Sequence, residues 1–347
     1  MPSKPLSELE TMVGDSVETV TGLTVEAGKV AEFANALRDS RRLFRDEETA
    51  TRAGYRTVPA PLTFTRVGYF PQYRPEGIGR DLGFDVGFAP ERVVHGSQAY
   101  RFERPVYVGE TLSGMTTLVD VFQRERSNGA RLTFAVLETE FRTTGGESVL
   151  TATNTRIETG DTDDGGSDTR TDGGSGDGSN GSGRADARSR GTTPGGSGRN
   201  EVSPDGGEAP TLRETEPGDS APVLTIPDIE RKDFVKYAGA SGDFNRIHYD
   251  EPYARAAGHD TVIGQGMLTA GYASRMAIDW FGLGAVREFS TRFESPIHPG
   301  DVLTVSGTAT DVSVSPPEKT VEAEYEVTKQ DGTTVATGGI TAVDSVE

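Results

Sequence analysis

The feature that most constrains the fold is an internal repeat, in which two distant segments carry the same residues at the same spacing. Residues 102–112 read Phe-Glu-Arg-Pro-Val-Tyr-Val-Gly-Glu-Thr-Leu, and residues 293–303 read Phe-Glu-Ser-Pro-Ile-His-Pro-Gly-Asp-Val-Leu. The Phe, Pro, Gly and Leu positions coincide, which is typical of a strand that ends at Pro, a Gly turn and a new strand. The chain therefore contains two related units.

Earlier segments extend the repeat at an offset of 204 residues: residues 45–47 with 53–54 match residues 249–251 with 257–258. Each half is predicted to run as a helix, a short helix and a series of long strands that closes in a Gly-containing hairpin. In the second half, residues 229–240 and 266–281 have helical periodicity. Four strands are predicted after them, at 288–294, 302–312, 321–329 and 334–343.

Between the halves lies a tract, residues 160–220, made almost entirely of Gly, Ser, Asp, Thr, Arg, Glu and Pro. Such a composition cannot bury enough apolar surface to offset the entropy of ordering, so the tract is predicted to be a disordered acidic linker. A structureless loop of this length inside one compact domain would be unusual. The predicted organisation is a first domain at 1–159, the linker at 160–220 and a second domain at 221–347.

Charge and cysteine content exclude several classes of protein. The 347 residues include 54 acidic and 35 basic side chains, for a net charge of −19, and no cysteine. Negative charge argues against nucleic-acid binding, and the missing cysteines exclude disulfides and thiolate sites. The acidic, Lys-poor composition is typical of halophilic proteins, whose self-repulsion salt screens; an acidic protein from an ordinary cytoplasm is the alternative. No signal peptide or membrane span is expected, which favours a cytoplasmic location.

The chemistry is concentrated in residues 241–248, Ser-Gly-Asp-Phe-Asn-Arg-Ile-His. Asp243, Asn245 and His248 supply a carboxylate, an amide and an imidazole, and Asp with His is an acid/base pair that works near neutral pH. A lone D-x-N-x-x-H pattern recurs by chance, and its residues could equally cap helices and turns. Here a short helix is predicted at 250–258, and Gly266 opens a long apolar helix eighteen residues beyond His248.

This combination resembles the MaoC-like, (R)-specific enoyl-CoA hydratases over nearly all of residues 223–347. A long helix followed by a meander that must wrap it is the hot-dog arrangement. Its repetition predicts an α+β double hot-dog, with two antiparallel sheets that each wrap a central helix. The resemblance implies reversible hydration of trans-2-enoyl-CoA to (R)-3-hydroxyacyl-CoA in fatty acid metabolism. The acyl-CoA thioester is then the substrate, and no metal or other cofactor is implied.

The resemblance also assigns roles to five residues. Asp243 and His248 would hold one water between them and transfer its protons, while Asn245 would orient their loop. The backbone N–H of Gly266, at a helix N-terminus, would donate to the thioester oxygen. Ser274 lies eight residues further on the same helix face and could touch the pair.

The first half lacks this set, because at the offset of 204 it carries Asp39, Arg41 and Phe44 in place of Asp, Asn and His. It is predicted to be catalytically silent, and it resembles the degenerate dehydratase-like N-terminal domain of such fusions. In those proteins the silent half helps to form the acyl pocket. Four residues are therefore candidates for lining the pocket, with ordinary core packing as the alternative: Phe64, Val67, Tyr69 and Phe70.

Departures from the pattern and rival functions complete the prediction. Arg246 stands where the family usually has Pro, and Gln265 where a His often precedes the Gly, which affects loop rigidity and substrate class. A thioesterase would need a carboxylate on the central helix, which has no acid before Asp279. A non-catalytic acyl-CoA-binding protein would not need the intact Asp-Asn-His set. The sequence does not fix the oligomeric state, and a homodimer of double hot-dogs is one alternative.

Overall fold

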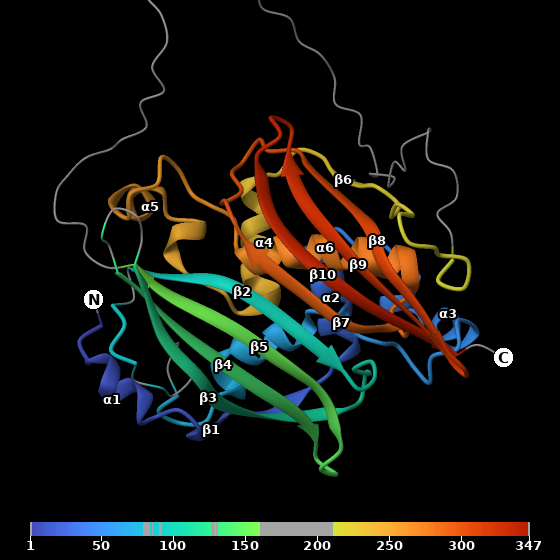
Figure 1. Cartoon of the computed structure of the whole chain (residues 1–347), viewed down its shortest axis with the longest axis horizontal. Coiled ribbons are helices and arrows are strands. Elements are labelled where there is room, and N and C mark those ends of the chain that lie inside the picture. Colours follow the sequence, from blue (N-terminus) through green and yellow to red (C-terminus); the bar gives the residue numbers. More distant parts are fainter. Residues whose placement is uncertain are drawn as a thin grey trace, which may run out of the picture.

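The computed structural model describes residues 2–78, 84, 86–89, 92–125, 129, 131–159 and 211–345, and its strands form one continuous antiparallel sheet. The strand order is β1-β3-β4-β5-β2-β7-β10-β9-β8-β6. The strands are β1 (Ser16–Thr24), β2 (Val93–Phe102), β3 (Thr111–Glu125), β4 (Arg131–Thr143), β5 (Ser148–Thr159), β6 (Leu224–Ile226), β7 (Val286–Phe293), β8 (Leu303–Ser315), β9 (Glu318–Lys329) and β10 (Thr334–Ser345). The two predicted sheets are thus joined edge to edge, where β2 pairs with β7 (Figure 1).

Helices lie on one face of this sheet. They are α1 (Leu6–Glu10), α2 (Ala27–Ala36), α3 (Glu47–Arg52), α4 (Arg231–Ser241), α5 (Glu251–Ala256) and α6 (Gly266–Phe281), with 3-10 turns η1 (Arg42–Phe44), η2 (Phe64–Tyr69), η3 (Pro71–Tyr73) and η5 (Arg246–His248). Strand alternation explains the single covered face: in β9, Val321, Ala323 and Tyr325 are buried, whereas Glu322 and Glu324 point to solvent.

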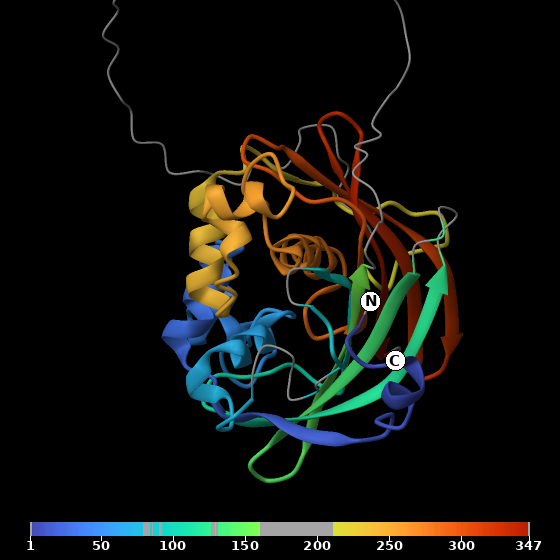
Figure 2. The same cartoon turned by 90° about the vertical axis from the view of Figure 1, so that its left-hand side faces the viewer.

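The central helix α6 is enclosed by the rest of the molecule, and Figure 2 shows it nearly end-on within the curve of the sheet. Of its residues only Gly266 and Asp279 are not buried, so the helix is enclosed on all sides. No helix in the described part of the chain has both the length and the apolarity needed to span a membrane.

The first half differs from the prediction of one central helix per sheet. The segment that corresponds to α6 at the offset of 204 is residues 62–77, and it forms the 3-10 turns η2 and η3 instead. Pro71 and Pro75 cannot continue an α-helix, and Gly68 weakens one. The helix signal was therefore absent from this part of the sequence.

The two halves interlock through helices as well as through the sheet. The Phe33 ring of α2 lies 5.6 Å from the Phe64 ring and 5.8 Å from the Tyr237 ring of α4. The Arg275 guanidinium of α6 donates to the carbonyl of Leu37 at 3.0 Å, and a Cβ on Gly271 would clash with the same Leu37 side chain. The halves therefore share one apolar core.

The end of the predicted linker needs correction. Residues 160–210 lie outside the described residues, but residues 211–220 pack against the second half. Leu212 and Thr215 are buried, and the Lys319 ammonium donates to the carbonyls of Arg213 at 2.7 Å and Thr215 at 2.9 Å. Leu212 gives this stretch an apolar anchor that its polar composition concealed. The packed part of the second half begins about ten residues earlier than predicted.

Replacing residues 160–210 by a Gly/Ser spacer long enough to join the halves is expected to leave kcat and Tm near their wild-type values. Extending the deletion through Ser220 should lower Tm, because the Lys319 ammonium then loses both carbonyl acceptors. The free energy of unfolding is expected to fall by roughly 1–3 kcal/mol. Thermal unfolding of the two variants makes the comparison. Equal Tm values would contradict the corrected boundary.

Candidate active site

The Asp-Asn-His segment forms the connection between α4 and α5. Helix α4 ends at Gly242, whose φ of 80° lies in the left-handed region that favours glycine. A Cβ at this position would also lie 3.0 Å from the backbone nitrogen and ring of Phe70. Gly242 thus turns the chain sharply against the first half and directs Asp243 back towards η5, which carries His248.

Asp243 and His248, here called the dyad, face each other without a direct hydrogen bond. Their Oδ1 and Nε2 atoms are 3.9 Å apart. The His248 Nδ1 atom lies 2.8 Å from the carbonyl oxygen of Ile263. Because a carbonyl only accepts, Nδ1 carries the proton, and Nε2 of the neutral ring is a free acceptor. Two acceptors at this separation can each bind one hydrogen of a single water.

Two side chains shape the loop around the dyad. The Asn245 Oδ1 atom accepts the backbone N–H of Ile247 at 3.3 Å and so caps η5. Arg246 donates to Asp250 Oδ2 from Nε at 3.0 Å and from Nη2 at 2.6 Å. Arg246 therefore ties the loop to the start of α5 at the position where the family usually has Pro.

Gly266 is the first residue of α6, so its N–H lies in the turn where no intrahelical acceptor exists and the helix dipole is positive. A Cβ on Gly266 would lie 3.2 Å from the Phe293 ring. Ser274 lies eight residues along the same helix, a rise of about 12 Å, and its hydroxyl donates to the Gly271 carbonyl at 2.8 Å. The hydrogen bond of Ser274 is thus made within α6 rather than to the dyad.

The four pocket candidates divide into two groups. Phe64 and Val67 are fully buried in the core shared by the halves. Phe70 lies beside the dyad loop, with its ring 6.2 Å from that of Phe244. The ring of Tyr69 packs against the guanidinium of Arg66, with 3.6 Å between the ring centroid and the Arg66 Cζ atom. Only Tyr69 and Phe70 are therefore placed next to the dyad, and their role in acyl binding stays a prediction.

Arg66 is the site residue that sequence reasoning missed. Its Nη2 atom donates to Asp243 Oδ2 at 3.1 Å, and the two side chains are only 13% and 19% exposed. It comes from η2 of the first half, 177 residues away in the chain. An arginine among inward-facing aromatic and apolar residues was the available signal, because a buried charge requires a partner.

Electrostatics set the resting charges of the dyad. Burial raises the pKa of Asp243, but Arg66, His248 and the Asn245 backbone lower it more, so the net shift is below its ordinary value of 3.8. Burial lowers the pKa of His248 below its ordinary 6.5, against an opposing effect from Asp243. At neutral pH the dyad is therefore a carboxylate beside a neutral imidazole.

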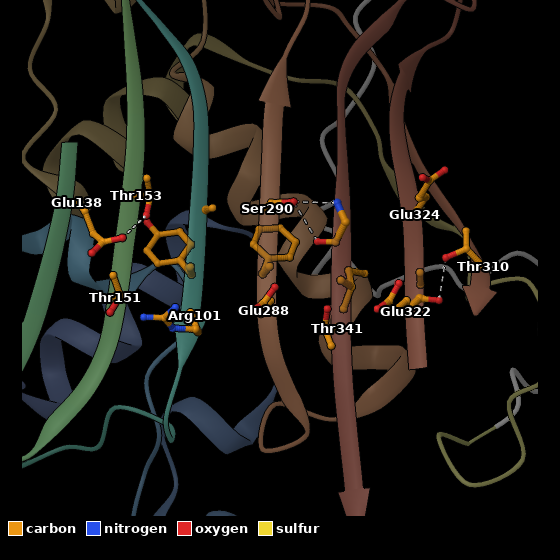
Figure 3. A pocket seen from close by; sticks show the side chains of 16 residues that line it. Arg101, Glu138, Thr151, Thr153, Glu288, Ser290, Thr310, Glu322, Glu324 and Thr341 are labelled. Carbon is orange, nitrogen blue, oxygen red and sulfur yellow. Dashed lines mark hydrogen bonds between the residues drawn. The ribbon is translucent and has the colours of Figure 1, made fainter. Parts of the chain in front are cut away.

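A separate hollow crosses the outer face of the sheet at the junction of the halves (Figure 3). Its volume is about 350 Å³, and hydroxyl and carboxylate side chains dominate its lining, among them Thr151, Thr153, Glu288, Glu322 and Glu324. No histidine lines it in the described part of the chain. It lacks an acid/base pair like that of the dyad, so the candidate active site is the dyad.

Sequence comparisons match each half to a different dehydratase region. The FAS1-like, dehydratase domain region matches residues 11–152, and the MaoC like domain matches residues 212–331. A UPF0336 protein of Thermobifida fusca is 33% identical over 150 residues, which cover 43% of this chain and 92% of the relative. A UPF0336 protein of Saccharopolyspora erythraea is 30% identical over 155 residues, covering 45% of this chain and 94% of that protein.

Solved structures share the fold over the whole chain. A MaoC-like dehydratase aligns with a TM-score of 0.71 at 24% identity, covering 98% of this chain and 100% of the other. A Mycobacterium tuberculosis protein described as having a double hotdog fold aligns with a TM-score of 0.60 at 15% identity, covering 98% of both. The predicted α+β double hot-dog class is confirmed. The chain therefore combines a FAS1-like dehydratase region in its first half with a MaoC like domain in its second, and it belongs to the family of the UPF0336 proteins.

Proposed function

We propose that the second half catalyses the reversible addition of water to a trans-2-enoyl-CoA, giving an (R)-3-hydroxyacyl-CoA. The observation that carries this proposal is the dyad itself: an ionised carboxylate and a neutral imidazole present two acceptors, Oδ1 and Nε2, 3.9 Å apart. Both groups lie in one loop. The Ile263 N–H donates a hydrogen bond to the Ile247 carbonyl, and this bond connects the loop to the segment that precedes α6. The (R) configuration is proposed from the resemblance of residues 241–248 to the (R)-specific hydratases.

The dyad geometry supports a simple order of events. A water that donates one hydrogen to Asp243 and one to His248 keeps its lone pairs free to attack C3. As the O–C3 bond forms, the C2=C3 electron pair moves towards the thioester oxygen, which the Gly266 N–H stabilises. One water proton passes to His248 Nε2 and from there to C2. The net result is H at C2 and OH at C3, with the catalytic groups restored.

The thioesterase alternative would rely on Asp279, the one carboxylate of α6. That residue lies thirteen residues after Gly266, about 20 Å along the helix axis. Its Oδ1 atom is 3.0 Å from the Arg41 guanidinium, so it is engaged at the opposite end of the helix. This placement favours hydration over hydrolysis.

One assay with crotonyl-CoA separates the candidate functions. Loss of the enoyl absorbance without release of free thiol is the expected result, and chiral analysis of the product tests the (R) configuration. Release of thiol would instead indicate a thioesterase. Binding without either change would indicate an acyl-CoA-binding protein. The acidic composition calls for assays in high salt as well as in dilute buffer.

The pH dependence of hydration follows from the resting charges. The reaction needs His248 neutral, so kcat/KM is expected to fall as pH decreases through the pKa of His248, which lies below 6.5. Asp243 stays ionised at neutral and mildly acidic pH, because its pKa lies below 3.8. A profile of kcat/KM with crotonyl-CoA makes the measurement. An acidic limb centred above pH 6.5 would contradict the assignment of His248 as the base.

A further inference from the structure

We propose that Arg66, a residue of the first half, is a positioning residue of the active site that orients the Asp243 carboxylate towards His248. This inference rests on the proposed hydration for its kinetic consequences. The contact between Arg66 and the dyad can be tested whatever reaction the protein catalyses.

The two oxygens of Asp243 have separate neighbours. Oδ2 accepts from Arg66 Nη2 at 3.1 Å, while Oδ1 faces His248 Nε2 at 3.9 Å. The Asn245 backbone also donates to this carboxylate, so Arg66 and Asn245 together hold it with Oδ1 towards the imidazole. Charge-assisted bonds of this kind are stronger than neutral ones, and partial burial reduces their screening by solvent.

The Arg66 side chain is held in place by the aromatic ring of Tyr69. Its guanidinium stacks 3.6 Å from the centroid of the Tyr69 ring, a cation–π geometry. Burial lowers the pKa of Arg66, but Tyr69 and Asp243 raise it more, so the group stays protonated at any working pH. The Arg74 guanidinium lies 4.9 Å from the same ring centroid, and Arg156 hydrogen-bonds the Tyr69 side chain, so Tyr69 contacts three cations.

Three other titratable groups of the described residues interact with Asp243, and each is uncharged at neutral pH. Burial lowers the pKa of His95, on β2, to about 3. Burial raises the pKa of Tyr237, on α4, well above 10. His248 is neutral in the resting dyad. Arg66 is therefore the permanent cation with the largest effect on the Asp243 carboxyl.

Arg66→Gln and Arg66→Met test the proposal, with Arg38→Gln as the matched control. Arg38 also pairs with an aspartate across the halves, Asp233, but it does not contact the dyad. The Arg66 variants are expected to lose about tenfold in kcat, less than the roughly 10²- to 10⁴-fold contribution of an acid/base group itself, because Arg66 acts through Asp243. The acidic limb of kcat/KM should move to higher pH, because Arg66 lowers the pKa of both Asp243 and His248. Arg66→Lys keeps the positive charge, so its acidic limb should lie closer to that of the wild-type protein. Arg38→Gln should lower Tm and leave the pH of the acidic limb unchanged.

A titration followed by NMR separates this proposal from the hydratase assignment. The chain has only four histidines, so the His248 imidazole can be followed in each variant. Its pKa should rise in the uncharged Arg66 variants and stay unchanged in Arg38→Gln, even if no enoyl-CoA is hydrated. In the wild-type protein, the Asp243 carboxyl should titrate below 3.8 despite its burial. An Asp243 value above 3.8, or a His248 curve unaffected by loss of Arg66 in a folded variant, would overturn the proposal.

Discussion

Replacing His248 with Ala, or Asp243 with Asn, is expected to lower kcat by about 10²- to 10⁴-fold while leaving the fold intact. The His248→Ala variant loses the free Nε2 acceptor that takes the proton of the attacking water. The Asp243→Asn variant keeps the shape of the carboxylate but loses its charge and offers a donor where an acceptor is needed. Steady-state hydration of crotonyl-CoA, with circular dichroism to check the fold, makes the measurement.

A matched histidine variant controls for the loss of an imidazole as such. His298 pairs with Asp301 and Lys329 in the turn before β8 and, within the described part of the chain, makes no hydrogen bond or ion pair to either dyad residue, so His298→Ala should keep near-wild-type turnover. The dyad assignment fails if His248→Ala or Asp243→Asn retains wild-type kcat in a correctly folded protein. It also fails if His298→Ala is as slow as His248→Ala.

Expressing residues 211–347 alone is expected to abolish the monomeric, active form. Removing the first half uncovers the edge of β7, whose partner in the sheet is β2. It also exposes the face of α6 at Gly271 that packs on Leu37, and it deprives Asp243 of Arg66. An unpaired strand edge beside an apolar face promotes association, so the fragment should aggregate or form a homodimer.

Sedimentation and hydration assays on the fragment decide this prediction. A homodimer with altered chain-length preference would fit a pocket that the first half normally completes. A stable monomer with wild-type kcat and unchanged substrate preference would mean that the first half neither completes the fold nor contributes to the site.

Local signals in the sequence were sufficient to locate the dyad loop. The spacing of Asp243, Asn245 and His248, the glycine that ends α4 and the glycine that opens α6 are all short-range features. The repeat at residues 102–112 and 293–303 likewise predicted the strand–turn–strand units of both halves. Each of these is a pattern in which neighbouring residues dictate backbone geometry.

Contacts between the halves were beyond such reasoning. Arg66 and Asp243 are 177 residues apart, and only the folded sheet brings η2 against the dyad loop. The replacement of a central helix by 3-10 turns was readable from Pro71 and Pro75, but the repeat favoured a copy of α6. The packing of residues 211–220 depends on a buried Lys319 whose acceptors are backbone carbonyls, and composition says nothing of these.

The joining of two unequal halves in one chain removes a restriction that symmetry imposes. In a dimer of identical hot-dog subunits, every residue occurs twice in equivalent positions. Arg66 corresponds at the offset of 204 to Ala270, a buried residue within α6, where an arginine would disrupt the core. In a symmetric dimer, one sequence position could not be both a small residue inside the central helix and an arginine that binds the Asp243 carboxylate of the other subunit. The fused chain has both, and it carries the Asp-Asn-His loop once instead of twice.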